Sequence, residues 1–73
     1  MTLTDLILSY LRDYGPTHTE VLMWFCEEQY SGWKMSTNAQ KWDEFNTSIN
    51  GVLVRQEAKV RFFEEGDSVL YLC

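Results

Sequence analysis

The sequence predicts an α+β fold in which three short helices are followed by a C-terminal antiparallel β-hairpin. Apolar residues recur at helical spacing through the first fifty positions, and capping-box patterns precede two of these segments. After Gly51 the spacing changes to that of β-strands. At 73 residues the chain has room for a single domain, 1–73, and can spare little apolar surface for a large pocket.

The first predicted helix starts at Thr2 or Thr4 and stops at Gly15 and Pro16. A threonine hydroxyl can cap its start, and Asp5 lies near the positive end of the helix dipole. Glycine accepts the left-handed C′ conformation, and proline cannot continue the hydrogen-bond ladder. The apolar stripe consists of Leu3, Leu6, Ile7, Tyr10, Leu11 and Tyr14.

The second predicted helix begins at Thr17 and Glu20, which have capping-box spacing, and fades between Gln29 and Gly32. Its apolar cluster consists of Val21, Leu22 and Phe25, with Cys26 beside them. His18 projects over this apolar face, which predicts a packed, hydrogen-bonded side chain.

The third predicted helix begins with a capping box formed by Thr37 and Gln40 and stops at Asn50 and Gly51. Its predicted buried stripe is Ala39, Trp42, Phe45 and Ile49. The opposite face would carry Thr37, Gln40, Lys41, Glu44, Thr47 and Ser48.

The β-rich runs 59–63 and 68–72 flank a Gly-containing turn at 64–67 and predict the hairpin. Because side chains alternate between the two faces of a sheet, one set should point inward and the other outward. The inward set is Val60, Phe62, Leu70 and Leu72, and the outward set is Lys59, Arg61, Phe63, Val69, Tyr71 and Cys73.

Three helices followed by a hairpin resemble the winged helix-turn-helix superfamily over nearly the whole chain. The residues that carry the resemblance run from the third helix into the hairpin: Ile49, Leu53, Arg55, Phe62 and Tyr71. It implies that the third helix enters a DNA major groove while the hairpin, the wing, touches the backbone or minor groove. By position, the contacts would come from Lys34, Thr37, Gln40, Lys41, Ser48, Arg55, Lys59 and Arg61. Glu44 and the acidic wing tip at 64–67 depart from the pattern of a strong binder.

The net charge of −5 is unevenly distributed. Residues 1–33 carry one base and five acids (1 − 5 = −4), residues 34–61 five bases and three acids (5 − 3 = +2), and residues 62–73 three acids (−3). Five of the six cations therefore lie where a winged helix meets phosphate. Useful non-specific affinity usually takes about six to ten phosphate contacts, so a monomer should bind double-stranded DNA weakly. A homodimer on a two-fold site would double the contacts, which suits a regulator of transcription or of a related DNA transaction.

A second hypothesis is an acidic protein-interaction module or inhibitor, such as a phage- or plasmid-encoded protein that binds a host protein. Its surface would be an aromatic cluster rimmed by Glu20, Glu27 and Glu28. The cluster consists of Met23, Trp24, Tyr30 and Trp33, which fall on or beyond the edge of the apolar stripe. In an alternative interpretation, Trp33 folds back and caps the core.

We expect no enzyme, cofactor or metal. The only histidine, His18, cannot reach Cys26 along a helix, and Cys73 is not at metal-ligand spacing from Cys26. The chain has no glycine-rich phosphate loop, no leader pattern and no apolar run long enough to cross a membrane. With only two cysteines, a cytoplasmic protein with reduced thiols is the expectation.

Overall fold

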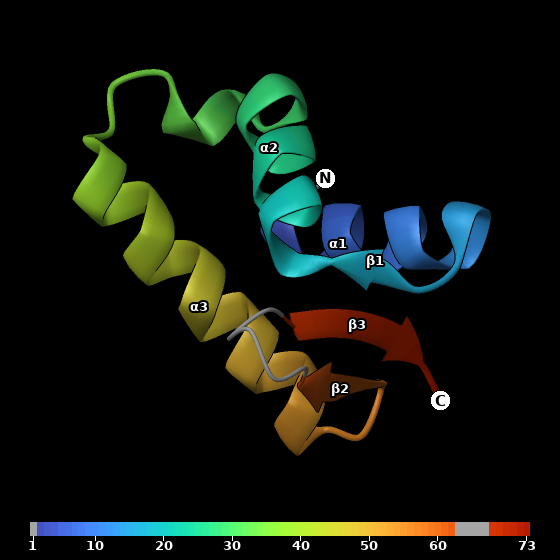
Figure 1. Ribbon diagram of the computed structural model, residues 1–73. Coiled ribbons are helices and arrows are strands. Elements are labelled where there is room, and N and C mark those ends of the chain that lie inside the picture. The colour runs from blue at the N-terminus through green and yellow to red at the C-terminus, as the bar shows by residue number, and fades with distance from the viewer. Residues whose placement is uncertain (1, 63–67) are drawn as a thin grey trace.

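The computed structural model describes residues 2–62 and 68–73, which form three α-helices and a three-stranded antiparallel sheet (Figure 1). The elements in chain order are α1 (Leu3–Tyr14), β1 (Thr17–His18), α2 (Thr19–Gln29), the 3₁₀ helix η1 (Ser31–Trp33), α3 (Asn38–Val54), β2 (Ala58–Phe62) and β3 (Ser68–Leu72). The sheet order is β1-β3-β2, so the last strand lies in the middle. The predicted α+β class is confirmed. No described helix is long and apolar enough to cross a membrane.

The core lies between the three helices and the inner face of the sheet. It consists of Leu3, Ile7, Leu11, Leu22, Met23, Cys26, Trp33, Phe45, Ile49, Val52, Ala58 and Leu70. Every helix and both long strands contribute to this cluster. The fold is therefore held together by contacts between segments that are distant in sequence.

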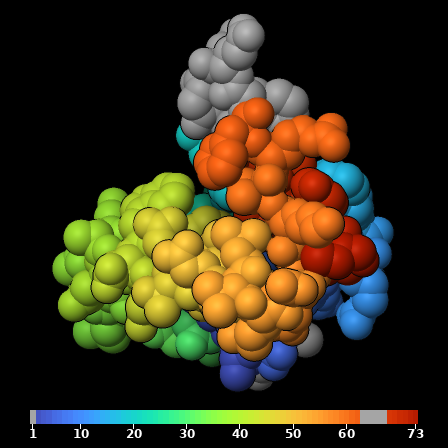
Figure 2. All heavy atoms as spheres, turned by 90° about the horizontal axis from the view of Figure 1, so that it is seen from below, coloured from blue at the N-terminus to red at the C-terminus, as the bar shows by residue number. Residues whose placement is uncertain are grey.

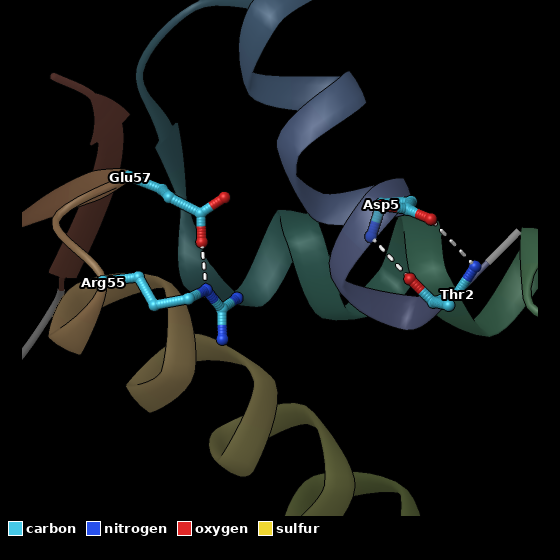
Figure 3. Close-up of polar contacts among 4 residues, drawn as sticks. All are labelled: Thr2, Asp5, Arg55 and Glu57. Atoms are coloured by element: carbon cyan, nitrogen blue, oxygen red, sulfur yellow. Dashed lines mark hydrogen bonds and ion pairs between the residues drawn. The ribbon is translucent and has the colours of Figure 1, made fainter.

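Helix α1 agrees with its prediction at both ends. The Thr2 hydroxyl accepts the Asp5 N–H at 3.1 Å, and the Asp5 carboxylate accepts the Thr2 N–H at 3.4 Å (Figure 3). The helix ends at Gly15, whose φ of 79° suits glycine. Tyr14 is exposed rather than buried, because the stripe runs past the end of the core, and its ring packs on Tyr10 instead.

Helix α2 starts one residue later than predicted, with His18 rather than Thr17 as its N-cap residue, and the capping box at Thr17 and Glu20 is wrong. Thr17 and His18 form β1, and Thr17 pairs with Leu70 of β3. The Thr17 hydroxyl donates to the Gly15 carbonyl at 2.8 Å and is buried. His18 precedes α2 as an exposed N-cap residue, so its predicted packing on the apolar face is also wrong.

The buried face of α2 differs from the predicted one. Leu22, Met23 and Cys26 are buried, whereas Val21 is exposed. The difference arises because α2 packs against α1 on one side and β3 on the other, which widens and rotates its buried face. Phe25 is half-buried and packs on a tyrosine of α1.

Helix α3 runs to Val54, beyond the predicted stop at Asn50 and Gly51. Its buried residues Phe45, Ile49 and Val52 have the spacing i, i+4 and i+7, so Val52 belongs to the helix and not to a strand.

The end of α3 is a Schellman motif centred on Gln56. Gln56 has a φ of 59° and donates its N–H to the Leu53 carbonyl at 3.1 Å. The Glu57 N–H donates to the Val52 carbonyl at 2.9 Å. The sequence gives no glycine signal for this stop, because a glutamine occupies the left-handed position.

The start of α3 has the predicted cap but not the predicted buried stripe. Thr37 and Gln40 form the capping box. Ala39 and Trp42, however, are exposed. Trp33 lies in the core instead, and its indole N–H donates to the Glu44 carboxylate.

The hairpin is confirmed, and Val60, which was predicted to face inward with Leu70, pairs with it. Ala58 adds a buried residue at its base. Phe62 was predicted to face inward, but it pairs with Ser68 at the far end of the hairpin, beyond the core, and is exposed. Phe63 and the predicted turn at 64–67 lie outside the described residues.

Candidate functional site

The solvent-facing side of α3 lies opposite its buried residues. Asp43, Thr47, Asn50 and Val54 follow one another at i, i+4, i+7 and i+11, and all are exposed. Asn46 lies beside them and is also exposed. This face carries two amides, one hydroxyl and the Asp43 carboxylate, and the only cation of α3, Lys41, lies elsewhere on the helix.

The residues predicted to read DNA bases do not gather on this face. Lys41 and Ser48 are half-buried on one flank of α3. Thr37 and Gln40 are exposed but bonded to each other: the Gln40 N–H donates to the Thr37 hydroxyl at 3.2 Å, and the Thr37 N–H donates to Gln40 Oε1 at 2.9 Å. The prediction of one shared face for these four residues is therefore wrong.

Sequence reasoning missed Asn46 and Asn50, the two side-chain amides on the exposed face. No hydrogen bond within 2–62 and 68–73 uses either amide. The spacing of Phe45, Ile49 and Val52 would have revealed them, because it fixes the rotation of the helix about its axis. That spacing was missed because the predicted helix ended at Gly51 and therefore did not include Val52.

The predicted cations lie in three places. Lys59 and Arg61 are exposed on the outer face of the sheet, where the Arg61 guanidinium lies 5.8 Å from the centre of the Tyr71 ring. Arg55, at the end of α3, donates to the Glu57 carboxylate (Figure 3). Lys34 lies near the start of α3, and both it and Lys41 line a pocket that also includes two glutamates of α2, Glu27 and Glu28.

Three of these five cations, Lys34, Lys59 and Arg61, are exposed and form no ion pair within the described residues. Figure 2 shows α3 and β2 next to each other on one face of the molecule. A long polymer that contacts α3 would therefore have β2 as its neighbour.

The predicted aromatic cluster is only partly a surface. Met23 and Trp33 are buried in the core, which corrects their assignment to an exposed interface. Tyr30 is half-buried and meets the Trp33 ring edge-on at 5.5 Å. Trp24 alone is largely exposed, at 64%. The interpretation in which Trp33 folds back onto the core is confirmed.

A groove that the sequence did not predict lies between α3 and the hairpin, with a volume of about 200 Å³. Its lining is Trp42, Phe45, Ile49 and Leu53 from α3 and Val60, Phe62 and Leu70 from the sheet, with Thr19, Asn46, Asn50 and Ser68 among them. We call this the α3 groove. It was missed because Trp42 and Phe62 were both predicted to be core residues.

Cys26 is a free, buried cysteine. Burial raises the pKa of the Cys26 thiol to about 12, so this thiol stays protonated at neutral pH. Within 2–62 and 68–73 no group of three or more His, Cys, Asp or Glu side chains could hold a metal ion.

Comparison with known proteins gives no family for this chain. No family model matches it, and neither the curated proteins nor the solved structures yield a match. The function is therefore argued from the chain's own geometry.

Proposed function

We propose that this chain is a winged-helix domain that binds double-stranded DNA through α3, with the β2–β3 hairpin as its wing. The order of helices and strands supports this, with a short β1 before α2 and the hairpin directly after α3. The observation that carries the proposal is the pair of amides Asn46 and Asn50 on the exposed face of the helix next to β2, which make no hydrogen bond to any residue that the structure describes.

The proposed contacts divide into two classes. Asn46 and Asn50 would read base edges, since an asparagine amide can bind adenine through two hydrogen bonds in the major groove. Lys59, Arg61 and Lys34 would neutralise phosphates, which positions the protein without reading sequence.

The strength of binding follows from the number of cations. Three phosphate contacts give a slope of log K against log salt of about −3. A monomer would bind weakly, and a dimer on a two-fold site would double the slope. The proposal therefore includes self-association on DNA, as suits a regulator of transcription or of a related DNA transaction.

Fluorescence anisotropy with duplex DNA, scanned over salt, tests the proposal. Replacing Lys59 and Arg61 together by alanine should reduce the size of the salt slope by about 2 per protomer, since each phosphate contact contributes about 0.9. Asn50→Ala should weaken binding and sequence discrimination while leaving the slope unchanged.

Arg12→Ala is the matched control, because Arg12 is an exposed cation of α1. It should leave binding unchanged. The proposal is rejected if the wild-type chain does not bind duplex DNA at low salt. An Arg12→Ala effect as large as that of Arg61→Ala would also reject it.

A further inference from the structure

The α3 groove leaves large apolar side chains in water. The Trp42 side chain is 42% exposed and Phe62 is 75% exposed, while Leu53 and Val60 between them are half-buried. An exposed tryptophan over a continuous apolar floor is typical of the centre of a binding surface. We infer that the α3 groove is the docking site for an apolar segment with basic flanks from a partner protein.

The size of the groove favours a protein segment as the occupant. Pockets for small molecules usually enclose about 300–1,000 Å³. The α3 groove, at about 200 Å³, is smaller and suits one or two apolar side chains presented by a larger chain. The amides of Asn46 and Asn50 line it and can bond to the backbone or polar groups of that chain.

The charge around the groove favours a basic partner. None of the lining residues within 2–62 and 68–73 is charged. Glu20 follows Thr19 in the chain and Asp43 follows Trp42, and both acids are exposed. The cations of β2 lie on the other face of the sheet from Val60, because neighbouring residues of a strand alternate.

The same charge disfavours a second copy of this chain as the occupant. Without DNA between them, two chains with a net charge of −5 repel each other, whereas a basic segment is attracted over a distance of about 8–10 Å in physiological salt.

Trp24, the other exposed tryptophan, lies on α2 and does not line the groove. Its replacement is therefore a matched control for the replacement of Trp42.

Docking goes beyond the proposed DNA binding and does not depend on it. If DNA does bind through Asn46 and Asn50, a segment in the α3 groove would compete with it, because both residues line the groove. That consequence, unlike docking itself, rests on the proposed function. Titrating DNA into the free chain, and then into the chain with a docked peptide, distinguishes docking itself from competition between the peptide and DNA.

The experiment is selection of random displayed peptides, each long enough for about four helical turns, on the immobilised chain. Enriched peptides are then synthesised, and their affinities are measured by anisotropy for the wild type, Trp42→Ala, Phe62→Ser and Trp24→Ala. Enriched peptides should combine apolar anchors with Lys or Arg. Trp42→Ala should weaken them about tenfold or more, as expected for a central aromatic, and Trp24→Ala should leave them unchanged. Amide NMR spectra establish that each variant is folded.

Three results would overturn the inference. The first is that no enriched peptide depends on Trp42 or Phe62 in a folded variant. The second is that the dependent peptides are acidic or uncharged. The third is a dimer in analytical ultracentrifugation that dissociates in the Trp42→Ala variant, which would mean that a second copy of the chain occupies the groove. Loss of DNA binding alone would reject the proposed function and leave docking in place.

Discussion

Helices α1 and α3 both begin with a capping box, yet a glycine ends one of them and lies inside the other. At Gly15 the chain turns away, and Pro16 follows. At Gly51 the helix continues, because Val52 comes next and is completely buried. A glycine inside a helix costs about 1 kcal/mol, whereas burying a valine contributes about 1.5–3 kcal/mol. Burial therefore outweighs the local stop signal.

The two helices also differ in the residue that makes the final turn. The α1 helix uses Gly15, which has a positive φ at little cost. The α3 helix places Gln56 in the left-handed region, at a cost of about 1–2 kcal/mol. The carbonyls of Val52 and Leu53 each gain a hydrogen bond in return. Where tertiary packing determines the end of a helix, the final turn can thus contain a residue, here Gln56, that does not favour a positive φ.

The largest expected effect tests the burial that extends α3. Val52→Ala should lower the free energy of unfolding by roughly 2–3 kcal/mol, because two buried carbons are removed at about 1–1.5 kcal/mol each. Urea denaturation measures the loss. Val54→Ala is the control, since Val54 is 82% exposed and should change stability by less than about 0.5 kcal/mol. Equal effects at both positions would show that Val52 does not anchor the helix.

The next effect compares the two glycines directly. Gly15→Ala should destabilise the fold by about 1–2 kcal/mol, because no atom of the described residues other than its chain neighbours lies within 4 Å of the added Cβ and the whole cost is conformational. Gly51→Ala should stabilise it by about 0.5–1 kcal/mol. There the added Cβ would lie 3.1 Å from Nη1 of Arg55, the end of an exposed side chain that can move. Denaturation of both variants that gave shifts of the same sign would contradict the comparison.

The smallest effect concerns the turn at the end of α3. Gln56→Gly should stabilise the chain by about 0.5 kcal/mol, because relief of about 1–2 kcal/mol in the left-handed region is partly offset by the greater freedom of glycine when unfolded. Gln56→Ala keeps a Cβ and should have almost no effect. Thermal unfolding of the two variants measures the difference. A stabilised alanine variant would mean that the glutamine side chain, not its φ, is unfavourable.

The candidate site was less predictable than the helices. The outward alternation of Lys59 and Arg61 followed from strand periodicity, and both side chains are exposed. Lys41 and Ser48 were misplaced because a stripe that included Ala39 rotated the expected face of α3. The α3 groove depends on two elements meeting across the fold, which no local pattern encodes.

The sequence by itself determined the parts that short-range physics controls: the capping box of α3, the end of α1 at Gly15 and the presence of the hairpin. The tertiary structure alone decided the β1 pairing, the length of α3 and which aromatic residues are buried. A core of this size cannot hold every large apolar side chain in a 73-residue chain. Trp33 entered it while Trp42 and Phe62 remained outside, because burial depends on which distant segments meet, and helical or strand periodicity contains no information about that.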